Sequence, residues 1–365
     1  MKRSAPPELS HRERVRLALG HRETDRVPIA MVCAGINPPA RAALEAHLRR
    51  ERGIGVEEYL EPLIDIKVVA PDYVGPALAP GTDTWGVHRK AVSYGDGHYN
   101  EIDHYPLAEA ETPDDLSRHA WPEPEWFDVA GVPDRVAQAQ AGGGPWCLMA
   151  MNGNPFETSW YMRGMERFMM DMVLKPELAH AILERVTDFY VEHFTRLLAA
   201  ARGEIDLVFT ADDIGGQQGL LMSLDMWAAF LKPCHERINR VVHEAGARVI
   251  YHSDGAVMDA APGLVDMGID VLQALQFDAS GMDPERLKRD FGDRLCFEGG
   301  VSVQKTLPFG TPDDVRREVR DRIRVLGRRG GYILGPSHAI QAGTPPENIA
   351  AMFDTAAATP MPSAS

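Results

Sequence analysis

The chain has 365 residues, of which 44% are hydrophobic and 25% charged, and its formal net charge is −15. This is the composition of an ordinary globular protein, and an acidic chain without a basic stripe excludes a nucleic-acid partner and disfavours a highly anionic substrate. No apolar segment has the length of a membrane span or the pattern of a secretory signal. Four widely spaced cysteines without a CxxC pair indicate a reducing, cytoplasmic compartment.

The predicted elements begin with a helix after Ser10, which Ser10 caps together with Glu13 in a capping box and which ends near Gly20. Helical patterns follow at Glu177–Ala200, Leu224–Ala245 and Pro312–Leu326. Continuous apolar runs, typical of strands buried on both faces, occur eight times: Val27–Cys33, Ile64–Ala70, Trp146–Met151, Leu207–Ala211, Val249–His252, Val271–Leu275, Leu295–Glu298 and Tyr332–Leu334.

This alternation predicts a single-domain α/β fold, a (β/α)8 TIM-type barrel over residues 10–355. A doubly wound open sheet is the alternative. Residues 1–9 and 356–365 are expected to be flexible tails. The stretch 77–133 is rich in Pro, Gly, Trp and His, and we interpret it as a long insertion after the second strand, with a β-hairpin, that forms a lid or a wall of the active site.

Seven segments resemble the uroporphyrinogen decarboxylase superfamily, and their order and spacing carry the resemblance over nearly the whole chain. They are RERVRLALGHRETDRVPI (12–29), DIKVVAP (65–71), GNPFETSWYMRGME (153–166), ADDIGGQQGLLMSLDMW (211–227), YHSDGAV (251–257), FEGGVSVQKTLPFGTPDDV (297–315) and GGYILGPSHAIQAGTPPENIAAM (330–352). The resemblance implies a TIM-type barrel. It also implies one of two activities, porphyrinogen decarboxylation or methyl transfer involving corrinoids, thiols or methoxylated substrates.

Three residues match active-site positions of the decarboxylases. Asp65 lies in an apolar stretch, where poor solvation is expected to raise its pKa, and it matches the aspartate that binds pyrrole NH groups. Tyr161 matches the active-site tyrosine, and His338 matches a histidine in the motif after the last strand. The alternatives are a structural carboxylate, an aromatic side chain on a helix face and a structural histidine.

His252 and Asp254 lie two residues apart at the end of a predicted strand, so their side chains share one face. The resemblance places them where the zinc methyltransferases have His-x-Cys-Gly, and His338 stands where those enzymes have a second cysteine. Two histidines and a carboxylate are a ligand set for zinc or another divalent metal. The loss of both thiolates argues against thiol-directed zinc chemistry, and a metal-free His/Asp pair is the alternative.

Other polar residues also follow predicted strands. Asp212 and Asp213 suit a base or a ligand for substrate or metal, with helix capping as the alternative. Glu298 is expected to point towards the barrel mouth. Further substrate-binding candidates are Glu157, Arg163, Gln304 and Gln341.

The stretch PIAMVCAGINPPA (28–40) lacks the arginines with which the decarboxylases hold an octa-anionic porphyrinogen. We therefore favour a methyltransferase or O-demethylase acting on a small, methoxylated substrate, with a corrinoid supplied by a carrier protein. A decarboxylase and a non-catalytic binding barrel are the alternatives, and a homodimer is an open possibility.

Overall fold

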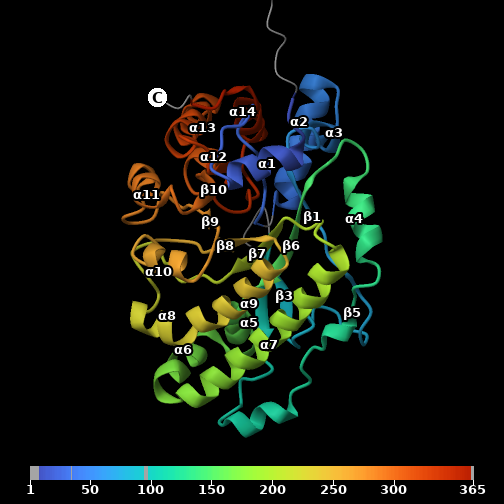
Figure 1. Ribbon diagram of the computed structural model, residues 1–365, viewed down its shortest axis with the longest axis vertical. Coiled ribbons are helices and arrows are strands. Elements are labelled where there is room, and N and C mark those ends of the chain that lie inside the picture. The colour runs from blue at the N-terminus through green and yellow to red at the C-terminus, as the bar shows by residue number, and fades with distance from the viewer. Residues whose placement is uncertain (1–7, 34, 94–97, 363–365) are drawn as a thin grey trace, which may run out of the picture.

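The computed structural model describes residues 8–33, 35–93 and 98–362. Its centre is a curled, parallel, seven-stranded sheet in the order β1-β6-β7-β8-β9-β10-β11 (Figure 1). The strands are β1 (Ile66–Val68), β6 (Cys147–Gly153), β7 (Leu207–Ala211), β8 (Arg248–His252), β9 (Val271–Ala274), β10 (Cys296–Val301) and β11 (Tyr332–Pro336). Each one falls on a predicted apolar run, which confirms the α/β class and the parallel sheet.

The segment Val27–Cys33, predicted as the first strand, is not a strand of this sheet but connects its two edges. Ile29 forms a parallel bridge with Leu334 of β11, and its carbonyl accepts a hydrogen bond of 2.8 Å from the amide of Asp65, just before β1. Pro28 has no N–H to donate to a regular ladder, which explains why only an isolated bridge forms.

Helices surround the sheet, and the last helix, α14, packs beside α2 near the start of the chain (Figure 1). The α-helices are α1 (His11–Leu19), α2 (Pro38–Arg52), α3 (Val56–Leu60), α4 (Val132–Gln140), α5 (Pro155–Arg163), α6 (Met165–Leu174), α7 (Pro176–Ala201), α8 (Leu224–Phe230), α9 (Lys232–Glu244), α10 (Ala261–Asp266), α11 (Pro284–Phe291), α12 (Thr306–Phe309), α13 (Pro312–Leu326) and α14 (Pro346–Ala358). None of the helices in the described part of the chain combines the length and apolarity needed to cross a membrane.

The predicted helices lie where the structure has helices, but one of them is divided in two. The capping box of Ser10 and Glu13 is present on α1. The helix predicted over Leu224–Ala245 is instead two helices that meet at Leu231, because Pro233 cannot continue a helix with a full set of hydrogen bonds. Helix α14 continues to Ala358, and Ala356 within it is completely buried.

The stretch between β1 and β6 contains its own small elements. They are β2 (Asp72–Tyr73), β3 (His88–Ser93), β4 (His98–His104), the 3-10 helices η1 (Pro113–Arg118) and η2 (Pro124–Trp126), β5 (Phe127–Asp128) and helix α4. Strands β3 and β4 pair antiparallel, as the predicted hairpin requires.

The interior of the curled sheet holds a separate apolar core. Two residues of α1, Val15 and Ala18, pack there with side chains from every strand of the main sheet. The strand members include Ile66, Cys147, Met149, Leu207, Phe209, Ala211, Ile250, Val271, Cys296 and Ile333.

Because strand side chains alternate between faces, residues two positions beyond these inner members also face the interior. On β8, β9 and β10 these residues are His252, Gln273 and Glu298, and all three are buried. The sheet therefore directs three polar side chains from neighbouring strands towards one point near the carboxyl ends of the strands.

Candidate active site

His252 occupies the centre of this group and is oriented by its neighbours. Its Nδ1 donates a hydrogen bond to the side-chain oxygen of Gln273, which leaves Nε2 as the nitrogen that faces the other polar side chains. That Nε2 lies 3.5 Å from Oδ1 of Asp213 and 3.8 Å from Oδ1 of Asp254. An imidazole with one nitrogen tied to a neutral acceptor and the other facing carboxylates is the arrangement of a metal-ligating histidine.

His338, in the loop after β11, completes the group from the far edge of the sheet. Its Nε2 lies 3.9 Å from Oδ2 of Asp254, and its ring centroid is 5.9 Å from that of His252. Among the described residues, two sets of side chains have ligand atoms within 4.8 Å of one another: Asp213, His252 and Asp254 form one, and Cys33, His252 and His338 form the other.

The distances fit a metal ion. Two ligands at tetrahedral angles on zinc, each about 2.0–2.2 Å from it, lie roughly 3.3–3.6 Å apart, and the measured separations of His252 from Asp213 and Asp254 are within a few tenths of an ångström of that range. Oδ1 of Asp254 is buried without a hydrogen-bond partner among the described residues. Such an orphaned oxygen is what a cation would satisfy.

Several acidic side chains lie close together at the carboxyl end of the sheet, which we call the mouth. Burial, opposed by His252 and His338, raises the pKa of Asp254. Burial and then the charges of Asp213 and Asp212 raise the pKa of Glu157 to about 8. Each of these carboxyl groups is easier to ionise once a cation is present, so the local field favours a cationic ligand over an anionic one.

Helix α5 brings Glu157 and Tyr161 to the mouth, and Asp212 fixes the start of that helix. Asp212 is fully buried and accepts the amide hydrogens of Phe156 and Glu157 at 3.0 and 2.8 Å. Its other contact is Nε2 of His235, at 2.7 Å. Asp212 therefore caps α5, a structural role that the sequence left open, although the capped helix is not the one that follows it in the chain.

Tyr161 is half-buried on α5, beneath the guanidinium of Arg89 from β3, which lies 5.0 Å from its ring centroid. Burial, with the charge of Glu157, raises the pKa of Tyr161 far above its usual range. The tyrosine is therefore a neutral hydroxyl group at neutral pH, suited to hydrogen bonding.

Glu298 is buried inside the sheet, and its Oε2 has no hydrogen-bond partner among the described residues. Burial raises its pKa well above the usual range. It lies on β10, beside the β9 residue Gln273 in the pairing register, and so belongs to the layer behind His252.

The structure corrects the prediction for Asp65. It precedes β1 and thus lies at the amino end of the sheet, opposite the end at which His252 closes β8. Its carboxylate is fully buried among His11, Arg14 and Arg26, at 2.7–2.8 Å from each. Burial alone would raise its pKa, but the hydrogen bond from His11 and the charges of Arg26 and Arg14 outweigh it and lower the pKa. The expected raised pKa was therefore wrong.

Three other residues that were predicted to bind substrate either contact other protein groups or are exposed to solvent. The guanidinium of Arg163 is buried against Asp171, at 2.7 Å, and against the carbonyls of Leu107 and Ala108. Gln341 accepts a 2.7 Å hydrogen bond from Asn37 and thereby joins two loops. Gln304 is exposed in the turn after β10.

Sequence reasoning missed Cys33 and Gln273. Both had a usable signal: Cys33 ends the first predicted strand, and Gln273 is a polar residue inside an otherwise apolar one.

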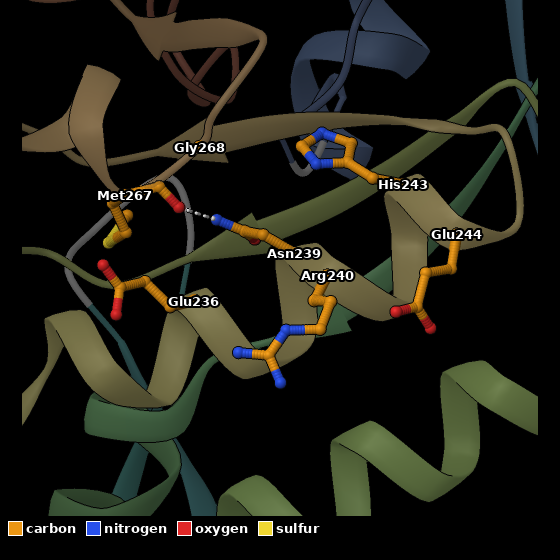
Figure 2. Close-up of a pocket in the computed structure, with 7 residues that line it drawn as sticks. All are labelled: Glu236, Asn239, Arg240, His243, Glu244, Met267 and Gly268. Atoms are coloured by element: carbon orange, nitrogen blue, oxygen red, sulfur yellow. Dashed lines mark hydrogen bonds between the residues drawn. The ribbon is translucent and has the colours of Figure 1, made fainter.

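A surface cavity of about 530 Å³ does not belong to the site. Its lining includes His243 (Figure 2). The hydrogen-bond partner of His243, Asp270, precedes β9 at the amino end of the sheet.

Known proteins resemble this chain in sequence and in fold. A methyltransferase from Methanosarcina mazei has a similar solved structure, with a TM-score of 0.65 and 19% identity, covering 96% of this chain and 99% of that one. A methylated-thiol–coenzyme M methyltransferase from the same organism is 28% identical over 234 residues, which are 64% of this chain and 59% of that protein. The uroporphyrinogen decarboxylase of Methylococcus capsulatus is 25% identical over 252 residues, which are 66% and 67% of the two chains.

The chain thus spans less than two thirds of the length of the first of these sequence relatives, so that relative's activity is not transferred as a finding. The family described as uroporphyrinogen decarboxylase (URO-D) matches residues 92–359, well over half of the chain. By this match, with a methyltransferase as structural neighbour, the chain belongs to the uroporphyrinogen decarboxylase family.

Proposed function

We propose that this protein is a metal-dependent methyltransferase that takes a methyl group from a small, methoxylated substrate and passes it to a corrinoid supplied by a partner protein. The observation that carries the proposal is the orientation of His252. Gln273 holds one ring nitrogen, and the other faces Asp213 and Asp254 at 3.5 and 3.8 Å. In this proposal the curled sheet and the Ile29 segment form a closed (β/α)8 barrel, and the 77–133 stretch is an insertion that walls its mouth.

His252, Asp254 and His338 would hold zinc or another divalent metal. When bound, such a metal supplies a Lewis acid for the oxygen that leaves the methyl group. A corrinoid in its reduced state would supply the nucleophile that accepts the methyl group, and the electron pair of the broken carbon–oxygen bond would stay on the oxygen. Glu157, whose pKa burial raises to about 8, would give the departing oxygen a proton. Tyr161 would orient the substrate.

Decarboxylation of a porphyrinogen is the alternative that the named decarboxylase relatives favour. The arginines that the sequence offers for it are engaged elsewhere. Arg41 pairs with Glu57, and Arg163 is buried against Asp171. The carboxyl groups at the mouth would also repel an octa-anion.

The test is methyl transfer from 2-methoxyphenol to free cob(I)alamin by zinc-loaded full-length protein, followed by the absorbance change on methylcobalamin formation. Methyl thiols and methylamines serve as further donors. We expect turnover by the native protein and none by His252→Ala. The matched control is His243→Ala, which removes a histidine at the other end of the sheet and should stay active. A zinc-loaded protein that transfers methyl from none of these donors would refute the proposal, as would an active His252→Ala variant.

A further inference from the structure

Cys33 stands beside the two histidines of the mouth, although it comes from a different part of the barrel. It closes the segment that joins the edges of the sheet, whereas His252 ends β8 and His338 follows β11. The sulfur of Cys33 lies within 4.8 Å of a ring nitrogen of each histidine. Three ligand atoms from three separate segments of the chain thus lie close together.

The other cysteines differ from Cys33. The sulfurs of Cys234 and Cys296 are close to backbone carbonyls, at 3.2 Å from Phe230 and 3.5 Å from Ala18, and Cys147 is fully buried in the inner apolar core. Cys33 is only half-buried, and among the described residues its sulfur makes no hydrogen bond of this kind. Burial and the charge of Asp254 raise the pKa of the Cys33 thiol, so a bound cation is what would convert this thiol to a thiolate.

We propose that Cys33 is a thiolate ligand of the metal, acting with His252 and His338 in a set of two nitrogens and one sulfur. The inference rests on the metal site of the proposed function and adds a ligand to it. On binding, the thiol S–H bond is exchanged for a sulfur–metal bond formed by the sulfur lone pair, and the proton is released to solvent.

A sulfur ligand decides which metal the site selects. Thiolate and imidazole together suit zinc, whereas carboxylates and water suit magnesium or manganese. The alternative set of Asp213, His252 and Asp254 is dominated by oxygen. With Cys33 as ligand, Asp254 is free to be a fourth ligand or to accept hydrogen bonds from a bound substrate, and the site prefers zinc.

The experiment replaces zinc by cobalt(II) in the full chain and records its absorption spectrum under reducing, oxygen-free conditions. We expect one cobalt per chain and a sulfur-to-cobalt charge-transfer band in the near ultraviolet. Cys33→Ser should still bind cobalt but lose that band. The matched control is Cys296→Ser, at the amino end of β10, which should keep it. X-ray absorption at the zinc edge of the native protein needs no variant, and should show one sulfur at about 2.3 Å.

The outcomes separate this inference from the proposed function. Native protein that binds cobalt or zinc without a sulfur neighbour, or a charge-transfer band that survives in Cys33→Ser, overturns the role of Cys33 and leaves the metal site standing. A sulfur band in a protein that transfers no methyl group overturns the proposed function only. A protein that binds neither cobalt nor zinc overturns the role of Cys33 and the metal requirement together.

Discussion

Gln273 decides which nitrogen of His252 faces the mouth. The amide oxygen of Gln273 accepts from Nδ1 of the histidine, and both side chains are buried on neighbouring strands that pair in register. The contact fixes the tautomer and the plane of the ring before any ligand arrives.

The first prediction concerns this contact. Gln273→Leu removes the acceptor, so the imidazole loses its preferred tautomer and orientation, and metal affinity should fall by about 10- to 100-fold. Competition with a chelating dye measures the change. Gln273→Glu keeps an acceptor at the same place and should retain most of the affinity. Equal affinities for the leucine variant and the native protein would show that Gln273 does not position the ligand.

A second prediction separates folding from chemistry at Asp65. Asp65→Asn removes the buried counter-charge of Arg26 and one of the two carboxylates that pair with Arg14, the other being Asp25, and breaking such a buried pair costs about 3–5 kcal/mol of unfolding free energy. Urea denaturation should show the loss, while methyl transfer per folded molecule stays unchanged. Asp134→Asn, at an exposed position on α4, is the control and should have little effect. A stable but inactive Asp65→Asn would place this aspartate in the reaction instead.

The third prediction concerns His193, which lines a cavity of about 270 Å³ beside α7 with Trp85, Phe127 and Phe189. Burial, with a smaller contribution from Arg196, lowers its pKa from 6.5 to about 4. Between pH 4 and 6.5, the imidazole of His193 is therefore protonated in the unfolded chain but neutral in the folded chain. The unfolding free energy contributed by this group is complete above pH 6.5 and falls as the pH drops towards 4, by about 3 kcal/mol in total.

Replacing the histidine by an aromatic residue that does not titrate removes this dependence. His193→Phe should flatten the decline in unfolding free energy between pH 6.5 and 4, as measured by denaturant titration at a series of pH values. Parallel curves for the variant and the native protein would contradict the assignment.

The fourth prediction is negative. Incubation with uroporphyrinogen under oxygen-free conditions should yield no coproporphyrinogen, as followed by fluorescence after oxidation of the products. Arg41 and Arg163 are paired with Glu57 and Asp171 and so are not available to hold the carboxylates of that substrate. Formation of coproporphyrinogen above the enzyme-free rate would show that the family's decarboxylase activity persists here.

Much of this architecture could be predicted because it depends on local patterns. Apolar runs mark the strands, and His252 and Asp213 adjoin the ends of such runs. Asp65 could not be understood in the same way, because its neighbours in the sequence are apolar while its partners Arg14 and Arg26 lie 51 and 39 residues away. A carboxylate in an apolar run looks poorly solvated until the fold supplies its counter-charges.

The neighbourhood of Cys33 was hidden for a related reason. Its two histidines lie more than two hundred residues further along the chain, and only the curling of the sheet brings them close to Cys33. Gln273 shows a different limit. Strand periodicity indicates which residues share its face, but not which side-chain atom of a neighbouring strand it will contact.

The ion pair between Arg163 and Asp171 limits how far this fold can be shortened and stay stable. Its guanidinium holds two carbonyls, of Leu107 and Ala108, that belong to the stretch between β1 and β6. Deleting that stretch would leave Arg163 and Asp171 as a buried pair stripped of part of its hydrogen bonding. A minimal version of the protein must therefore either keep residues 107 and 108 or replace Arg163 and Asp171 together with apolar side chains.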